Sequence, residues 1–282
     1  MTMLEKFSFL AQPLDHPEGV VWGGGGRLYA GGEAGQVYSI QLEDGSVREV
    51  ARTGGFLLCV ALDAEGRVYA CDMGRNEVVR ADPGTGEVEV YSPGTADEPM
   101  VCPNYCAFAD DGSLYVTASG NWKQDDGAIY KVHPGGRTEV WSHALTRYPN
   151  GCAMNAAGDA LYVAESAVPH LSRISINKDG SAGPVERIAV LEGTVPDGVC
   201  VDEHGDIYVS CYRPDRIYRV SKTGSVQILA DDPEGQVFNQ PTNMAFVGDE
   251  LDRMAVANLG GWHIAIGDIG VRGLPVRRPS VP

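Results

Sequence analysis

Short apolar runs alternate with turn residues along the whole chain, and one arrangement of them recurs six times. In residues 148–165 a Pro-led loop brings the polar Asn150 into a short apolar run, Gly158 marks a turn, and a second apolar run reaches Val163. Turn residues that flank β-branched and aromatic runs at this spacing predict two adjacent antiparallel strands. The other copies centre on residues 18–29, 58–69, 104–115, 197–208 and 242–254.

The length of the repeat predicts the architecture. Successive copies are 40, 46, 47, 46 and 46 residues apart, counted through Tyr29, Tyr69, Tyr115, Tyr162, Tyr208 and Met254. This is the length of one four-stranded propeller blade. We therefore expect an all-β fold, a six-bladed β-propeller with four-stranded antiparallel blades around a central channel and almost no helix.

The two ends of the chain complete this prediction. Residues 5–10 alternate through Phe7, Ser8 and Phe9 before the first copy, so we expect them to pair with the last blade and close the ring. Because no Ser- or Pro-rich linker divides the chain, residues 1–282 are expected to form a single domain. Residues from about 271 to 282 are expected to be a loose C-terminal tail.

One position of the repeat is polar in most copies. Counting back eight residues from the turn glycine of each copy, or aligning the sixth copy through Met254, gives one residue per blade: Glu18, Leu58, Asn104, Asn150, Asp197 and Thr242. Because blades are related by rotation about the channel, these side chains are expected to converge at one end of its axis.

Four of the six converging residues carry oxygen ligands: Glu18, Asn104, Asn150 and Asp197. Carboxylate and amide oxygens suit hard cations such as Ca²⁺, Mg²⁺ or Mn²⁺. Each of these residues could instead be a turn former that bonds its own loop backbone. Their common register favours a metal site.

The motifs around these residues resemble those of the gluconolactonase/regucalcin (senescence marker protein) family over nearly the whole chain. Glu18 lies in Pro-Glu-Gly, Asn150 in Pro-Asn-Gly, Asp197 in Pro-Asp-Gly and Asn104 in Pro-Asn-Tyr. The resemblance implies a six-bladed propeller with one divalent cation on the axis, held by Glu18, Asn150 and Asp197, while Asn104 contacts metal or substrate. We take Ca²⁺ as the first choice, with Zn²⁺, Mn²⁺, Mg²⁺ or Fe²⁺ as alternatives.

The chain departs from the family pattern at the substrate side. Family members place an Arg two residues before the blade-three Asn, where this chain has Cys102, and blade two contributes the apolar Leu58. Both differences favour a substrate less polar than gluconolactone. Trp122, in an insertion at residues 120–127, is expected to form a wall of the pocket. His16 is a candidate proton shuttle at the mouth, although a lone loop histidine is more often a surface or structural residue.

The resemblance and the residues together predict a metal-dependent hydrolase of lactones, with Asp197 or a hydroxide held by the ion as the base. Two alternatives stay open: a propeller enzyme that catalyses a cyclisation or condensation in a biosynthetic pathway, and a non-catalytic metal- or ligand-binding propeller. No Gly-x-Ser-x-Gly, His-Glu-x-x-His, Gly-x-Gly-x-x-Gly or P-loop pattern occurs, so other common enzyme classes lack support.

Charge and cysteine content restrict the partners. The net charge of −16 mostly serves solubility, and it disfavours nucleic acid and anionic membrane as partners. The seven cysteines form no C-x-x-C pair, and the N-terminus has no long apolar core, so a cytoplasmic location is expected. The expected partner is a small-molecule substrate, and the expected state is a monomer or weak homo-oligomer.

Overall fold

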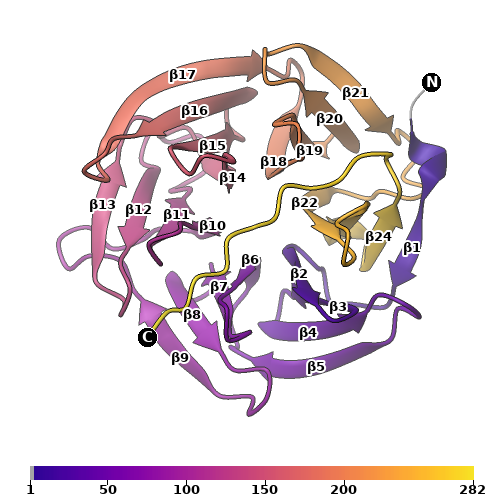
Figure 1. The fold of residues 1–282 in the computed structure, drawn as a ribbon, viewed down its shortest axis with the longest axis horizontal. Coiled ribbons are helices and arrows are strands. Elements are labelled where there is room, and N and C mark those ends of the chain that lie inside the picture. The colour runs from indigo at the N-terminus through magenta and orange to yellow at the C-terminus, as the bar shows by residue number, and fades with distance from the viewer. Residues whose placement is uncertain (1–2) are drawn as a thin grey trace.

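Six four-stranded antiparallel sheets form a ring in the computed structural model, which describes residues 3–282 (Figure 1). The predicted all-β, six-bladed propeller is confirmed. Apart from the two short 3₁₀ turns at Leu4–Lys6 and Leu259–Gly261, the described residues contain no helix. None of their elements is a helix long and apolar enough to cross a membrane.

The first three blades, each read from the channel outward, follow the chain order. Their strands are β2 (Val20–Gly24), β3 (Arg27–Gly31), β4 (Gln36–Gln41) and β5 (Val47–Arg52); β6 (Leu57–Leu62), β7 (Val68–Asp72), β8 (Glu77–Ala81) and β9 (Val88–Ser92); β10 (Pro103–Phe108), β11 (Leu114–Ala118), β12 (Ala128–Val132) and β13 (Thr138–Ser142).

The fourth and fifth blades repeat this order, and the sixth takes its outer strand from the N-terminus. Their strands are β14 (Pro149–Met154), β15 (Ala160–Glu165), β16 (His170–Ile176) and β17 (Ala182–Val190); β18 (Val195–Val201), β19 (Ile207–Arg213), β20 (Arg216–Val220) and β21 (Val226–Asp231); β22 (Pro241–Val247), β23 (Arg253–Asn258), β24 (His263–Gly267) and β1 (Phe7–Ala11).

The ring closes where the two ends of the chain meet. Strand β1 pairs antiparallel with β24, and Phe7 lies opposite Gly267. This is the pairing expected from the alternation at residues 7–9. It gives the last blade its fourth strand from the N-terminal end of the chain, and this strand closes the ring.

The inner strands β2, β6, β10, β14, β18 and β22 contact their neighbours around the ring and line the channel. Glycine permits the closest of these contacts. A Cβ on Gly151 would lie 2.2 Å from the carbonyl oxygen of Asp197, and a Cβ on Gly198 would lie 2.6 Å from that of Thr242. A larger residue at either glycine would therefore push two blades apart.

The C-terminal residues differ from the sequence-based expectation. Residues 273–282, which we call the C-terminal strap, cross one end of the channel instead of forming a loose tail (Figure 1). Leu274 N donates to Val201 O at 2.9 Å in blade five, and the Arg278 guanidinium donates to Trp22 O and Gly23 O in blade one. The strap is ordered because its backbone and arginines bond to several blades.

A mostly apolar cavity of about 380 Å³ lies in the channel beneath the strap. Leu274, Pro275 and Val276 of the strap contribute to its wall, together with inner-strand residues such as Phe108 and Met154. The strap therefore covers apolar channel surface that would otherwise face water.

Candidate functional site

The start of each inner strand carries one of the predicted converging residues. Glu18 lies two residues before the first residue of β2, and Asn104, Asn150 and Asp197 lie near the starts of β10, β14 and β18. All four are buried, with 3 to 6% of their surface exposed. The sheet register shifts at the same place, between Pro149 and Cys152 in blade four, so these residues leave the regular pairing. Such irregularities redirect side chains, here at the end of the channel.

The buried oxygens of this cluster lack donors. Within residues 3–282, no hydrogen-bond partner reaches Glu18 Oε2, Asn104 Oδ1, Asn150 Oδ1 or Asp197 Oδ1. Buried polar atoms are rarely left unpaired, because each costs about 1 to 3 kcal/mol. Atoms that can only accept are completed by a cation or by water. This donor set fits a hard divalent cation.

Two serines fix the orientation of the asparagine amides. The Ser119 hydroxyl donates to Pro149 O at 2.8 Å, so its oxygen is free to accept, and Asn104 Nδ2 donates to it at 3.0 Å. Because the amide nitrogen faces the hydroxyl, the amide oxygen is turned the other way, where it has no partner.

Ser166 repeats this arrangement one blade further on. It donates to Pro196 O at 2.5 Å and accepts from Asn150 Nδ2 at 3.0 Å. Each serine thus joins the asparagine of one blade to the backbone of the next. The sequence analysis did not identify these serines, although both lie four residues after the tyrosine that ends their repeat.

The two carboxyl groups of the cluster act on each other. Burial raises the pKa of Glu18 well above its usual range, and the negative charge of Asp197 raises it further. Burial also raises the pKa of Asp197, and interaction with the Asn150 side chain opposes that rise. A cation beside both groups would offset the cost of burying their charges.

Blade six differs from its expected contribution. Thr242, the residue at the common register, uses its hydroxyl to donate to Glu18 O at 2.9 Å. The next residue, Asn243, has the free buried oxygen instead: its Nδ2 donates to Leu58 O at 3.1 Å, and no residue of the described chain pairs with its Oδ1. Asn243 is therefore a candidate ligand that the register count missed by one position.

Tyr105, the residue after Asn104, spans the channel with a hydrogen bond. Its hydroxyl donates to Val199 O at 3.4 Å, which links blade three to blade five. Tyr105 also lines the apolar cavity that the strap covers. Its ring thus contributes to the boundary between that cavity and the oxygen cluster at the other end.

Four residues at the mouth have left-handed backbone. His16, Cys102, Tyr148 and Gln240 have φ values of 41°, 54°, 62° and 53°. Each directly precedes a proline and lies two residues before the common register. Positive φ is unfavourable for these residue types, and such strain is concentrated at functional sites.

The predicted substrate-binding residues divide into two groups. Cys102 Sγ lies 3.6 Å from Tyr148 Oη, and the exposed Trp122 ring packs edge-on against the Tyr148 ring with centroids 4.9 Å apart. The insertion therefore packs against the loop that precedes β14 in blade four. Leu58 is 4% exposed and lines the inner ring.

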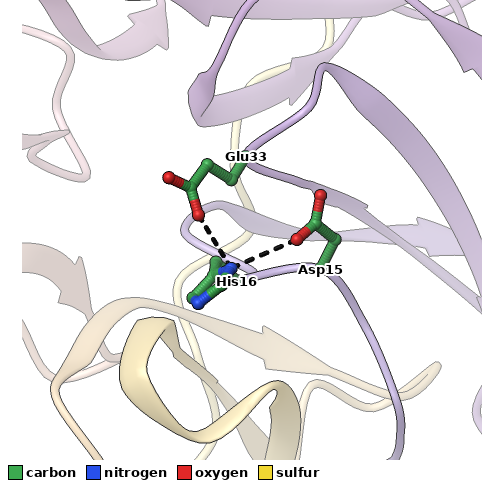
Figure 2. A group of neighbouring side chains, drawn as sticks. All are labelled: Asp15, His16 and Glu33. Carbon is green, nitrogen blue, oxygen red and sulfur yellow. Dashed lines mark hydrogen bonds and ion pairs between the residues drawn. The ribbon is translucent and has the colours of Figure 1, made fainter.

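His16 belongs to a separate cluster on the rim (Figure 2). Its Nδ1 lies 3.1 Å from Asp15 Oδ1 and 2.7 Å from Glu33 Oε2. Gln36 Nε2 donates to Asp15 Oδ2 at 2.8 Å and holds that carboxylate in place. The ring of Trp262 packs on the imidazole at 4.7 Å. This partly exposed cluster has the geometry of a histidine between two carboxylates.

Comparison with known proteins agrees with this description. Lactonase drp35 of Staphylococcus haemolyticus is 25% identical over 179 residues, which are 58% of this chain and 53% of that protein. Lactonase drp35 of Staphylococcus epidermidis is 27% identical over 133 residues, 44% of this chain and 39% of that protein. The chain thus spans about half the length of these relatives, or less.

Solved structures show the same fold. A regucalcin from Agrobacterium tumefaciens, described as a calcium-binding protein, superposes with a TM-score of 0.80 at 17% identity and covers 98% of each chain. A gluconolactonase from Xanthomonas campestris gives 0.79 at 20% identity, with 95% of this chain and 89% of that chain covered. The model of the SMP-30/gluconolactonase/LRE-like region matches residues 16–259, and the chain belongs to this family.

Proposed function

We propose that the chain is a divalent-cation-dependent lactonase, which adds water to a cyclic ester and releases the open hydroxy acid. The observation that carries this proposal is the cluster of buried oxygens without donors at one end of the channel. The family and the lactonase relatives support the reaction class.

The ligands we propose are Glu18, Asn150 and Asp197, with Asn104 and Asn243 as further oxygen donors. When bound, a divalent cation supplies positive charge that polarises the ester carbonyl. We keep Ca²⁺ as the first choice because every proposed ligand atom is an oxygen. In this proposal Asn104 contacts either the ion or the substrate.

Asp197 is the proposed general base. In this role its carboxylate takes a proton from the water that attacks the ester carbon, and the ring C–O bond then breaks to give a carboxylate and a hydroxyl group. Glu18 remains a proposed ligand. The serine-held amides of Asn104 and Asn150 keep their oxygens in position without reorganising during the reaction.

The proposed substrate is less polar than gluconolactone. Leu58, Cys102 and Trp122 offer few hydrogen bonds to sugar hydroxyls, and each buried hydroxyl without a partner costs about 1 to 3 kcal/mol. His16 remains a proposed residue of the mouth, where its Nδ1 lies near the carboxylates of Asp15 and Glu33.

We also propose that the chain acts as one domain in the cytoplasm, as a monomer or weak homo-oligomer. The seven unpaired cysteines support a reducing compartment. The net charge of −16 supports a small-molecule substrate over nucleic acid or an anionic membrane.

The test is a lactonase assay on protein stripped with a chelator and then reloaded. Ring opening should disappear on stripping and return with one equivalent of Ca²⁺ or another divalent cation, measured by proton release and by metal analysis. Full activity in metal-free protein would refute the proposal. Stoichiometric metal without ring opening of any lactone would favour a binding protein.

A further inference from the structure

Tyr148 has a position in the mouth that the sequence analysis did not assign to function. It lies two residues before Asn150, directly before Pro149, with left-handed backbone at φ 62°. Cys102 has the same place in the neighbouring blade, and the two side chains meet at 3.6 Å between Oη and Sγ. The pair therefore stands at the mouth between the loops that carry Asn104 and Asn150.

The neighbours of Tyr148 hold its ring in place. Trp122 packs edge-on against it at 4.9 Å. The insertion that carries Trp122 is itself tied to the Tyr148 loop, because Arg147 Nε lies 2.7 Å from Asp125 Oδ1. Tyr148 is only partly buried, so a ligand that enters the mouth can reach it.

The phenol is poorly paired. Tyr148 directly precedes β14 and stands two residues before the proposed ligand Asn150. Within the described residues, its hydroxyl has the Cys102 thiol as hydrogen-bond partner. Whichever group donates, sulfur is a weak hydrogen-bond partner, so the phenol O–H can be given to a better acceptor at little cost. An oxygen atom of a bound substrate could therefore replace the Cys102 thiol as the hydrogen-bond partner of the Tyr148 hydroxyl.

We propose that the Tyr148 hydroxyl donates a hydrogen bond to the carbonyl oxygen of the bound ester, beside the proposed cation. This inference rests on the proposed lactonase function. The donor acts where negative charge develops as water attacks, and a donor so placed stabilises the transition state more than the bound substrate. Tyr148 would therefore be a catalytic residue as well as part of the apolar wall.

The test compares Tyr148→Phe with Tyr162→Phe, which removes a hydroxyl from the same blade in the sheet strand β15. With δ-valerolactone and saturating Ca²⁺, Tyr148→Phe should lower kcat by about tenfold or more and change KM less, because the lost contact is strongest in the transition state. Bound Ca²⁺ and the melting temperature should stay near those of the unmodified protein. Tyr162→Phe should leave kcat unchanged.

A Tyr148→Phe protein with undiminished kcat would overturn the inference and leave the lactonase proposal standing. The same holds if its kcat falls only in step with lost Ca²⁺. An unmodified protein that opens no lactone with any divalent cation would overturn both.

Discussion

The serine that orients Asn150 allows a quantitative prediction. Ser166→Ala removes two buried hydrogen bonds, the donation to Pro196 O at 2.5 Å and the acceptance from Asn150 Nδ2 at 3.0 Å. At about 1 kcal/mol for each neutral bond, the free energy of unfolding should fall by about 2 kcal/mol. In a chain of this size that corresponds to a fall in melting temperature of roughly 4 to 8 °C.

The same change should weaken the proposed metal site. Without the hydroxyl, the Asn150 amide can turn its nitrogen toward the cluster, and loss of such a supporting contact typically costs 10- to 100-fold in metal affinity. We expect the Kd for Ca²⁺ to rise at least about tenfold, measured by calorimetric titration of chelator-treated protein.

Ser172→Ala is the matched control. Ser172 is a buried serine of the same blade, but it lies on β16, two strands outward from β14, where it pairs with Val163 and Arg187. It should leave Ca²⁺ affinity unchanged. If Ser166→Ala lowers the melting temperature while its Kd stays within about twofold, the amide is oriented by something else and the reasoning is wrong.

Three further changes test other parts of the structure. In chelator, Glu18→Gln should melt no lower than the unmodified protein, because a buried negative charge is removed. It should lose the rise in melting temperature that Ca²⁺ gives the unmodified protein, which corresponds to about 2.7 kcal/mol of stabilisation at 100 times Kd. An undiminished rise would show that the ion binds elsewhere. Arg278→Met should lower the free energy of unfolding by about 1 to 3 kcal/mol and speed proteolysis of the C-terminal strap, because two hydrogen bonds from Arg278 to blade one are lost. Equal proteolysis rates in the two proteins would show that the strap is held without Arg278. Cys102→Arg should improve kcat/KM for gluconolactone relative to δ-valerolactone, and a tenfold preference for gluconolactone in the unmodified protein would contradict the proposed apolar pocket.

Repetition made the fold and much of the candidate site predictable from the sequence. The spacing of the six copies implied the blades, and the common register brought Glu18, Asn150 and Asp197 to one end of the channel, where the structure places them. Such inferences need only rotational symmetry. They do not depend on the details of any one blade.

Features that break the repeat were not predictable in this way. Blade six has Thr242 at the common register, and the buried oxygen without a partner belongs to the next residue, Asn243. The strap has no periodic pattern in its sequence. It is held by hydrogen bonds to backbone carbonyls such as Trp22 O and Val201 O, and every residue type carries such a carbonyl. Contacts of this kind leave no signature in composition or spacing.

The closure of the ring by β1 constrains how the molecule can be made. Phe7 and its partner Gly267 are 260 residues apart in the chain (267 − 7), so the ribosome makes Phe7 long before Gly267. At typical rates of synthesis the N-terminal strand must wait on the order of ten seconds to a minute for β24. During that time β1 has no partner strand, and an unpaired strand edge invites pairing with other chains. The pairing that closes the finished ring therefore leaves β1 exposed until β24 has left the ribosome.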